Sequence, residues 1–367
     1  MAAMLGPTEA PALQAIGYSP RWQAFFEPYA KQGLVVARVV RADRGSVLVA
    51  TEADVMRAKP SPAFLKAASG LADMPAVGDW VAVLAAGDLE IALIEAVLTR
   101  ASAITRGDPG GTSGVQVLAA NIDTVFVVHP LVEEPNVRRI ERELSLAWDS
   151  GAVPVVVLTK ADLSPDLEAA CEAVRAIAPD TDVLVTYALE DGGAEPLLPY
   201  ISGHRTAVLV GPSGAGKSTL INALLGEQRQ ATREVRVSDG RGRHTTVARE
   251  LIQMPGGGVL IDTPGLRAVG LTGSEEGISS AFPEIQDASS ACRFRDCTHT
   301  EEPGCAVRAA VEDGTLSAER LESYLKLVRE AQVAAARTDV RLRAEEERKG
   351  KTIAKASKEY FQHVDRR

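Results

Sequence analysis

One segment constrains the fold of this chain more than any other, the glycine-rich run Gly211-Pro212-Ser213-Gly214-Ala215-Gly216-Lys217-Ser218-Thr219. The apolar residues Ala207–Val210 before it predict a buried strand, and Leu220, Ile221 and Leu224 after it predict the apolar face of a helix. A strand, a glycine loop and a helix in this order are the setting that a phosphate-binding P-loop requires. Backbone N–H groups of such a loop surround phosphate oxygens, and the helix N-terminus adds positive potential. The run therefore predicts a nucleotide-binding α/β domain, with an ordinary glycine-rich turn as the alternative.

Three further positions complete the expected phosphate end of the site. We expect Lys217 to reach the β- and γ-phosphates and the Ser218 hydroxyl to bind Mg²⁺. Asp262, 44 residues after Ser218, follows the predicted strand 258–261 and begins the sequence Asp262-Thr263-Pro264-Gly265. A carboxylate at this strand end is the expected second partner of Mg²⁺, and Gly265 can offer its N–H to a γ-phosphate. Alone, such a sequence is a common turn; beside a P-loop it predicts a phosphate sensor.

The residue after Gly265 is Leu266, whose side chain cannot hydrogen-bond to water. Either hydrolysis is slow or another side chain orients the attacking water. The candidate is His244, which lies between the P-loop helix and Asp262, two residues before Thr246. We expect a loop at this position to close on the γ-phosphate, with the Thr246 hydroxyl completing the magnesium shell and the imidazole positioning water. The alternative for His244 is an exposed polar loop residue.

A base-recognition loop is predicted well before the P-loop, at Thr159-Lys160-Ala161-Asp162, after the predicted strand 153–158. It is similar to the Asn-Lys-x-Asp signature of GTPases, in which the Asp carboxylate accepts two hydrogen bonds from guanine and the Lys stem packs on the base. Adenine lacks those two donors. Thr159 stands where the signature has Asn, which removes an amide contact, and turns after strands often contain Asp in any case. A second strand end, 185–188, is expected to add backbone contacts to the base.

These elements occur in the order base loop, P-loop, switch segment and Asp262, whereas ordinary GTPases begin with the P-loop. In a parallel sheet every such site lies at the carboxyl end of a strand, so cutting and rejoining the chain elsewhere preserves the pocket. The sequence therefore predicts a circularly permuted GTPase domain.

The pattern of the chain changes several times along its length. Residues 1–32 predict a flexible lead-in without periodicity, whereas 33–106 contain short β-type runs that are typical of a small barrel or sandwich. Within that barrel, 51–74 are expected to form a long loop. Residues 105–113, rich in glycine, predict a linker.

From residue 114 buried strands alternate with helices, which is typical of a doubly wound parallel sheet. Helices are expected at 136–149 and 165–177, and strands 249–254 and 258–261 predict a hairpin. Beyond about 270 the strands stop, and a later helix places Leu321, Tyr324 and Val328 on one face.

The four cysteines are unevenly distributed, with three of them inside the 14 residues 292–305. Three thiolates and one imidazole fit a closed tetrahedral zinc site without an open position for catalysis. A Cys292–Cys297 disulfide is the alternative, which a reducing compartment and the adjacent His299 disfavour. Cys171 is expected to pack in a helix. The predicted zinc ligands are Cys292, Cys297, His299 and Cys305.

The net charge of −9 argues against a chain that coats nucleic acid along its whole length. Residues 348–367 nevertheless carry seven Lys or Arg against two acidic residues, a local balance of +5 that predicts either a solvated tail or an RNA contact. No apolar run approaches the roughly 18 residues of a membrane span, and no positively charged leader begins the chain. We therefore expect a cytoplasmic protein without membrane contact.

With these motifs in this order, the chain resembles the bacterial ribosome-small-subunit-dependent GTPases, which are circularly permuted and act late in maturation of that subunit. The likeness spans about residues 33–335 and includes Val77-Gly78-Asp79-Trp80-Val81 and Gln116–Asp123 besides the motifs above. It implies a multidomain fold with an OB-fold barrel that binds RNA, a central α/β P-loop GTPase domain and a mostly helical zinc domain. It also implies slow intrinsic GTP hydrolysis that the subunit stimulates, with the outer domains gripping ribosomal RNA and protein.

The domains expected on this basis are the lead-in 1–32, the OB-fold 33–106, the GTPase domain 114–272, the zinc domain 273–340 and a basic tail 341–367. We expect a monomer that binds GTP or GDP with Mg²⁺ and one structural Zn²⁺. The expected catalytic residues are His244, Lys217 and Thr246, and the magnesium ligands Ser218, Thr246 and Asp262. The expected GTP-binding residues are Thr159, Lys160, Ala161, Asp162, Gly211, Pro212, Ser213, Gly214, Ala215, Gly216, Lys217, Ser218, Thr219, Asp262 and Gly265.

The leading hypothesis is a GTP-hydrolysing assembly factor of the small ribosomal subunit, released by hydrolysis. A second hypothesis is an rRNA-binding module in which the nucleotide only orders the fold, and Leu266 is its best support. A third is a P-loop ATPase or small-molecule kinase, for which Asp162 would not decide the choice of nucleotide.

Overall fold

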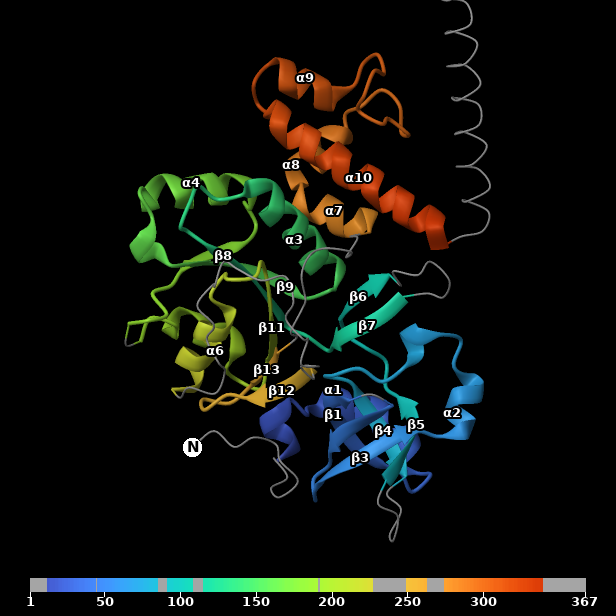
Figure 1. The fold of residues 1–367 in the computed structure, drawn as a ribbon. Coiled ribbons are helices and arrows are strands. Elements are labelled where there is room, and N and C mark those ends of the chain that lie inside the picture. The colour runs from blue at the N-terminus through green and yellow to red at the C-terminus, as the bar shows by residue number, and fades with distance from the viewer. Residues whose placement is uncertain are drawn as a thin grey trace, which may run out of the picture.

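A computed structural model describes residues 12–43, 45–84, 91–107, 115–190, 192–226, 249–262 and 274–338. Figure 1 shows a barrel (blue), a central α/β part (green to yellow) and a helical part (orange to red) on the opposite side of the centre from the barrel. Within the described residues, one hydrogen-bonded sheet runs in the order β10-β9-β8-β11-β13-β12-β1-β2-β3-β5-β4, and β6 and β7 form a separate pair.

The barrel consists of five strands whose hydrogen bonds close into a ring. Strands β1, β2, β3, β5 and β4 are neighbours in that order, β3 and β5 are parallel, and β4 returns to pair with β1. A closed five-stranded barrel of this kind is the OB-fold architecture that the sequence predicts. The strands are β1 (Val35–Asp43), β2 (Ser46–Ala50), β3 (Val55–Pro60), β4 (Trp80–Leu84) and β5 (Ile91–Val97).

The prediction of a long loop over residues 51–74 is wrong. This segment contains β3, the helix α2 (Pro62–Ala67) and the 3-10 turn η2 (Leu71–Asp73). In β3 only Val55 and Ala58 are buried, and the remaining side chains are exposed or partly buried. Because β3 contains polar residues and has prolines nearby, its sequence lacks the hydrophobic alternation that predicts a strand.

The prediction of a flexible lead-in is also wrong for its described part. Residues Leu13–Ile16 form η1 and Pro20–Ala30 form α1, with Ser19 at the N-cap position and Pro20 at the first helical position. The side chains of Leu13, Ile16, Trp22 and Phe26 are buried in the largest hydrophobic cluster of the structure. Their burial, rather than local periodicity, orders this segment.

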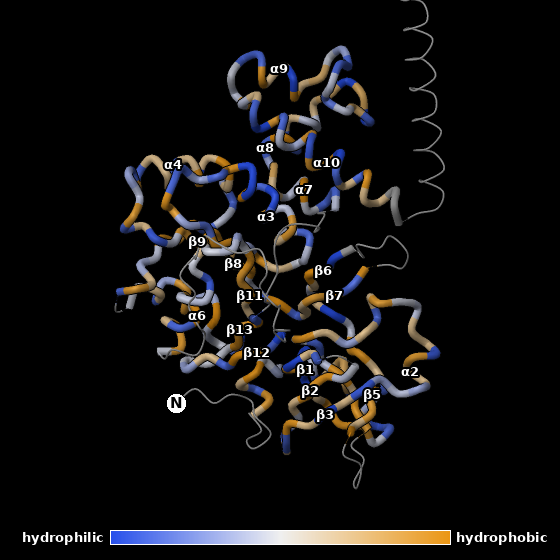
Figure 2. Tube along the Cα trace, viewed as in Figure 1, coloured by the Kyte–Doolittle hydropathy of each residue, from blue (hydrophilic) through white to orange (hydrophobic). Residues whose placement is uncertain are grey.

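The central part is the doubly wound sheet that the sequence predicts. Strands β10, β9, β8, β11 and β13 are all parallel, and β12 pairs antiparallel with β13 as the expected hairpin. Apolar residues make up most of β8, β9 and β11 in the interior (Figure 2). The strands are β8 (Thr124–Pro130), β9 (Val153–Thr159), β10 (Asp182–Val185), β11 (Thr206–Val210), β12 (Arg249–Gln253) and β13 (Val259–Asp262), and the helices are α3 (Val137–Asp149), α4 (Leu167–Ile177), α5 (Leu198–Ile201) and α6 (Lys217–Leu225), with η3 (Ala161–Leu163) and η4 (Glu195–Leu197).

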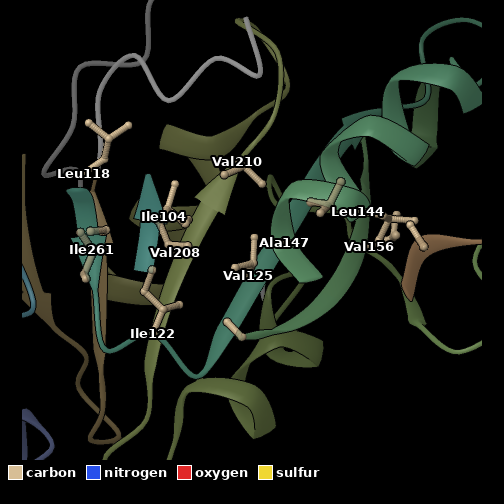
Figure 3. Close-up of a cluster of buried hydrophobic side chains, with 14 of the residues drawn as sticks. Ile104, Leu118, Ile122, Val125, Leu144, Ala147, Val156, Val208, Val210 and Ile261 are labelled. Carbon is tan, nitrogen blue, oxygen red and sulfur yellow. The ribbon is translucent and has the colours of Figure 1, made fainter. Parts of the chain in front are cut away.

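A hairpin of β6 (Ala103–Gly107) and β7 (Val115–Ala120) joins the barrel to the central sheet. Three residues of the predicted linker therefore belong to a strand, and 108–113 lie outside the described residues. Figure 3 shows Ile104 and Leu118 of this hairpin beside Val208 and Ile261 of the sheet. The hairpin thus covers one face of β11 and β13, whereas α6 belongs to the cluster on the other face.

The barrel is fastened directly to the P-loop strand. The Arg38 side chain of β1, 1% exposed, donates hydrogen bonds to the carbonyls of Gly78 and Ile16 and, at 2.8 Å, to the Thr206 hydroxyl at the start of β11. Burial lowers the pKa of Arg38 to about 10, while the nearby Asp123 carboxylate raises it, so the guanidinium stays charged at neutral pH. Strand β1 also pairs with β12, which makes barrel and sheet continuous.

The C-terminal helices pack against α3. A Cβ atom at Gly277 would lie 2.5 Å from the Ser145 carbonyl oxygen, so glycine allows α7 to approach α3 this closely. Arg320 of α10 pairs with Glu141 of α3 at 2.8 Å, and both side chains are buried. The helices are α7 (Glu275–Ala281), α8 (Pro283–Ser289), α9 (Ala306–Glu312) and α10 (Ala318–Thr338). Among the described helices, none combines the length and apolar character needed to cross a bilayer.

Candidate functional site

The glycine run forms a loop between β11 and α6, as its sequence predicts. All five residues of β11 are buried, and the loop turns through Gly211 (φ 145°), Gly214 (φ 80°) and Gly216 (φ 90°). A Cβ atom at Gly211 would lie 2.2 Å from the Val128 carbonyl oxygen, so this position tolerates only glycine. The backbone of this loop therefore fits a phosphate group, because these glycines allow the loop to turn its N–H groups inward at a helix N-terminus.

Lys217 begins α6 and lies over the loop. Its ammonium group donates hydrogen bonds to the carbonyls of Gly211 (2.8 Å) and Pro212 (2.7 Å). The side chains of Ser218 and Thr219 are partly buried in the first turn of the same helix. This arrangement places one positive charge and two hydroxyls at the mouth of the loop.

The base loop lies directly against the P-loop. Strand β9 ends at Thr159, Lys160 takes the left-handed conformation (φ 56°), and Asp162 is exposed in η3. The Thr159 hydroxyl, on a residue 2% exposed, donates to the Ala215 carbonyl at 2.6 Å. Segments 56 residues apart in sequence are thereby joined by a buried hydrogen bond.

The end of β10 supports the base loop from the other side. The backbone N–H and the hydroxyl of Thr186 both donate to the Leu158 carbonyl, at 2.8 and 3.2 Å, and Thr186 is fully buried. The Tyr187 N–H donates to the Gly193 carbonyl. A Cβ atom on residue 193 would lie 1.9 Å from the Tyr187 carbonyl oxygen, so glycine is needed at this position. Residues 185–188, expected to contribute backbone near the base, are thus held beside Thr159.

The sequence analysis did not predict a group of buried polar side chains beneath the base loop. His129, next to last in β8, accepts a long hydrogen bond from the Thr159 hydroxyl at its carbonyl (3.4 Å), and its ring lies 2.7 Å from the Glu143 carboxylate of α3. Arg139 also pairs with Glu143 at 3.2 Å. The only signal of this pair in the sequence was a polar residue in each element, His129 in an apolar strand and Glu143 in an amphipathic helix.

Asp262 ends β13, the strand beside β11. The pairs Val208–Ile261 and Glu250–Asp262 fix its level in the sheet, near the start of the P-loop. The side chain is partly buried. The other residues predicted for this end of the site, His244, Thr246 and Gly265, lie outside the described residues.

The predicted metal ligands converge on one point. Ligand atoms of Cys292, Cys297, His299 and Cys305 all lie within 4.8 Å of one another. The Cys292 and Cys305 sulfurs are 3.9 Å apart, and each lies 3.7 or 3.5 Å from Nδ1 of His299. A tetrahedral zinc with sulfur at ~2.3 Å and nitrogen at ~2.05 Å would separate its ligands by about 3.8 and 3.6 Å. The residues therefore fit a metal ion, and the Cys292–Cys297 disulfide alternative fails because both cysteines are free thiols.

Glu302 organises this cluster without joining it. Its carboxylate accepts hydrogen bonds from the N–H and hydroxyl of Thr298 and from the N–H groups of Thr300 and Glu301. These bonds lower the pKa of Glu302 to about 2, with the Thr298 hydroxyl as the main cause. Glu302 thus holds the turn that presents the neighbouring His299.

Fold and site together define a circularly permuted P-loop GTPase with an N-terminal five-stranded barrel and a C-terminal Cys/His cluster. The family model described as RsgA GTPase matches residues 97–272, and one described as 50S ribosome-binding GTPase matches residues 206–349. The chain belongs to the RsgA GTPase family.

Relatives cover nearly the whole chain. The small ribosomal subunit biogenesis GTPase RsgA of Streptomyces coelicolor is 48% identical over 91% of this chain and 90% of its own, and that of Streptomyces avermitilis is 48% identical over 90% and 88%. Among solved structures, YjeQ from Thermotoga maritima (28% identical) superposes with a TM-score of 0.62 over 81% of this chain and 98% of its own. YloQ, described as a circularly permuted GTPase, is 26% identical with a TM-score of 0.58 over 82% and 95%.

Proposed function

We propose that this GTPase is an assembly factor of the small ribosomal subunit, acting in the cytoplasm as a monomer late in maturation. Relatives named for that process match about nine tenths of the chain at 48% identity. The small subunit stimulates hydrolysis, and hydrolysis releases the protein. The match to a family described by the large subunit spans only residues 206–349, so it carries less weight.

The observation that supports guanine specificity is the hydrogen bond from Thr159 to the Ala215 carbonyl. Because it joins the base loop to the P-loop, Asp162 and Lys217 can hold the two ends of one nucleotide. Asp162 accepts from guanine, Lys160 packs on the base, and Lys217 neutralises the β- and γ-phosphates. Thr159 keeps one donor to the P-loop although it lacks the amide of Asn.

Mg²⁺, bound by Ser218, Asp262 and Thr246, would supply charge neutralisation at the β- and γ-phosphates. His244 positions the attacking water, and Gly265 offers its N–H to the γ-phosphate. Three cysteines and His299 hold one structural zinc, which fixes the C-terminal domain for contact with ribosomal RNA and protein. The proposed domains of this protein are the barrel 33–106, the GTPase domain 114–272, the zinc domain 273–340 and the basic tail 341–367.

The test is the turnover of GTP and of ATP by the purified protein, with and without small ribosomal subunits. We expect slow GTP turnover alone, a large increase with subunits, and little ATP turnover under either condition. The proposal fails if subunits leave the GTP rate unchanged. His244→Ala separates it from a nucleotide-ordered rRNA-binding module, because unchanged stimulated turnover would favour the module.

A further inference from the structure

Strand β12 presents its first residue, Arg249, to the face of the sheet that lies under the β6–β7 hairpin. Side chains alternate along a strand, and Leu251 belongs to the same buried cluster as Ile104 and Leu118 of the hairpin. Arg249, two residues before Leu251, therefore leaves β12 on that face. Ile252 faces the opposite cluster, which contains α6 residues.

The hairpin directs a second arginine into the same space. The bulge between β6 and β7 skips Leu118, so the alternation of β6 itself is undisturbed. Arg106 shares a face with Ile104, which lies beside Val208 of the central sheet in Figure 3. Both arginine side chains are partly buried. Burial, and then the positive charge of Arg106, lower the pKa of Arg249, which places the two guanidinium groups within electrostatic reach of each other.

Neither arginine has a carboxylate partner among the described residues. Other arginines among the described residues do have one, since Arg41, on the strand paired with β12, pairs with Asp43 at 3.0 Å and Arg100 pairs with Asp79 at 2.7 Å. Two like charges brought together where they are partly shielded from water repel each other unless an anion lies between them. The arrangement is therefore costly for folding and suited to binding an anion.

That anion is not the bound nucleotide. Asp262 lies directly opposite Glu250 and one residue beyond Ile261, so it faces the α6 side of the sheet, where the P-loop holds phosphates. Arg249 faces the other side, between the sheet and the hairpin. The ligand must come from outside the nucleotide pocket.

We propose that Arg106 and Arg249 form a binding site for a backbone phosphate of ribosomal RNA, at the junction of barrel and GTPase sheet. This inference rests on the proposed function. A chain with a net charge of −9 cannot attract RNA by its overall charge, so it needs local sites at which guanidinium groups meet phosphates. Arginine suits this role because its planar donors match phosphate oxygens in pairs.

The first experiment uses sulfate as the probe and needs no ribosome. Thermal unfolding of the GDP-bound full chain is followed with sulfate and with chloride at matched ionic strength, so that the P-loop is already occupied. Sulfate should raise the melting temperature of the wild type more than that of Arg106→Gln/Arg249→Gln. The exposed Arg175 of α4, which has no ion-pair partner among the described residues, provides the control Arg175→Gln. Equal sulfate shifts in the wild type and the double variant overturn the site.

The second experiment measures binding to small ribosomal subunits at several salt concentrations. Loss of one phosphate contact should reduce the slope of log affinity against log salt by about 0.7 to 0.9 and weaken binding at physiological salt. Arg175→Gln should match the wild type. A sulfate effect combined with an unchanged slope in the double variant overturns the assignment to RNA. If wild type binds no subunits, the proposed function fails, and the sulfate experiment still decides whether the anion site exists.

Discussion

Removal of the Thr159 hydroxyl is the sharpest test of how the nucleotide site is assembled. In Thr159→Val the side chain keeps its shape, but the Ala215 carbonyl loses the donor at 2.6 Å. Both residues are buried, 2% and 0% exposed, so water cannot replace the bond. Leaving a buried acceptor unsatisfied costs about 1–3 kcal/mol.

This free energy divides between folding and binding. If all of it appears in stability, the melting temperature falls by about 2–12 °C for a domain of this size. If all of it appears in binding, GTP affinity falls by about 5- to 150-fold, because each 1.4 kcal/mol is a factor of ten. We expect both to fall, and the two measured losses should together lie within the range of 1–3 kcal/mol.

Equilibrium titration with a fluorescent GTP analogue and calorimetric unfolding measure the two parts. Thr159→Ser keeps the hydroxyl and should retain GTP affinity. Thr186→Val is the matched control, because the Leu158 carbonyl also accepts the Thr186 N–H and stays satisfied without the hydroxyl. Wild-type affinity and melting temperature in Thr159→Val would refute the reasoning, as would an equal loss of affinity in Thr159→Ser.

Three other changes give distinct outcomes. Asp162→Asn should weaken GTP by about tenfold or more relative to ATP in a competition assay, because guanine loses its carboxylate acceptor; an unchanged ratio contradicts the base loop. Cys305→Ser should lower the metal content below the one zinc per chain that we expect by elemental analysis, and should lower the melting temperature. Arg320→Met should cost about 3–5 kcal/mol in denaturant unfolding, since the buried Glu141 carboxylate loses its ion pair and keeps only the Ser323 hydroxyl, whereas Arg320→Met/Glu141→Gln should recover part of it.

Local patterns in the sequence predicted the elements that depend on neighbouring residues. The apolar run before Gly211 and the apolar spacing after Lys217 predicted β11 and α6, and the alternation of strands and helices predicted the parallel sheet. The same patterns failed at β3 and α1. There the burial of Ala58 or Trp22 depends on what the rest of the fold places against them.

The sequence by itself determined the motifs and the chemistry that each one offers, because a glycine loop or a group of four soft metal ligands acts through residues that are close in the chain. Only the tertiary structure decided which distant residues meet. The contact of Thr159 with Ala215, the ion pair of Arg320 with Glu141 and the shared face of Arg106 and Arg249 follow from strand order, register and helix packing. These depend on burial of the whole core, which no short window of sequence contains.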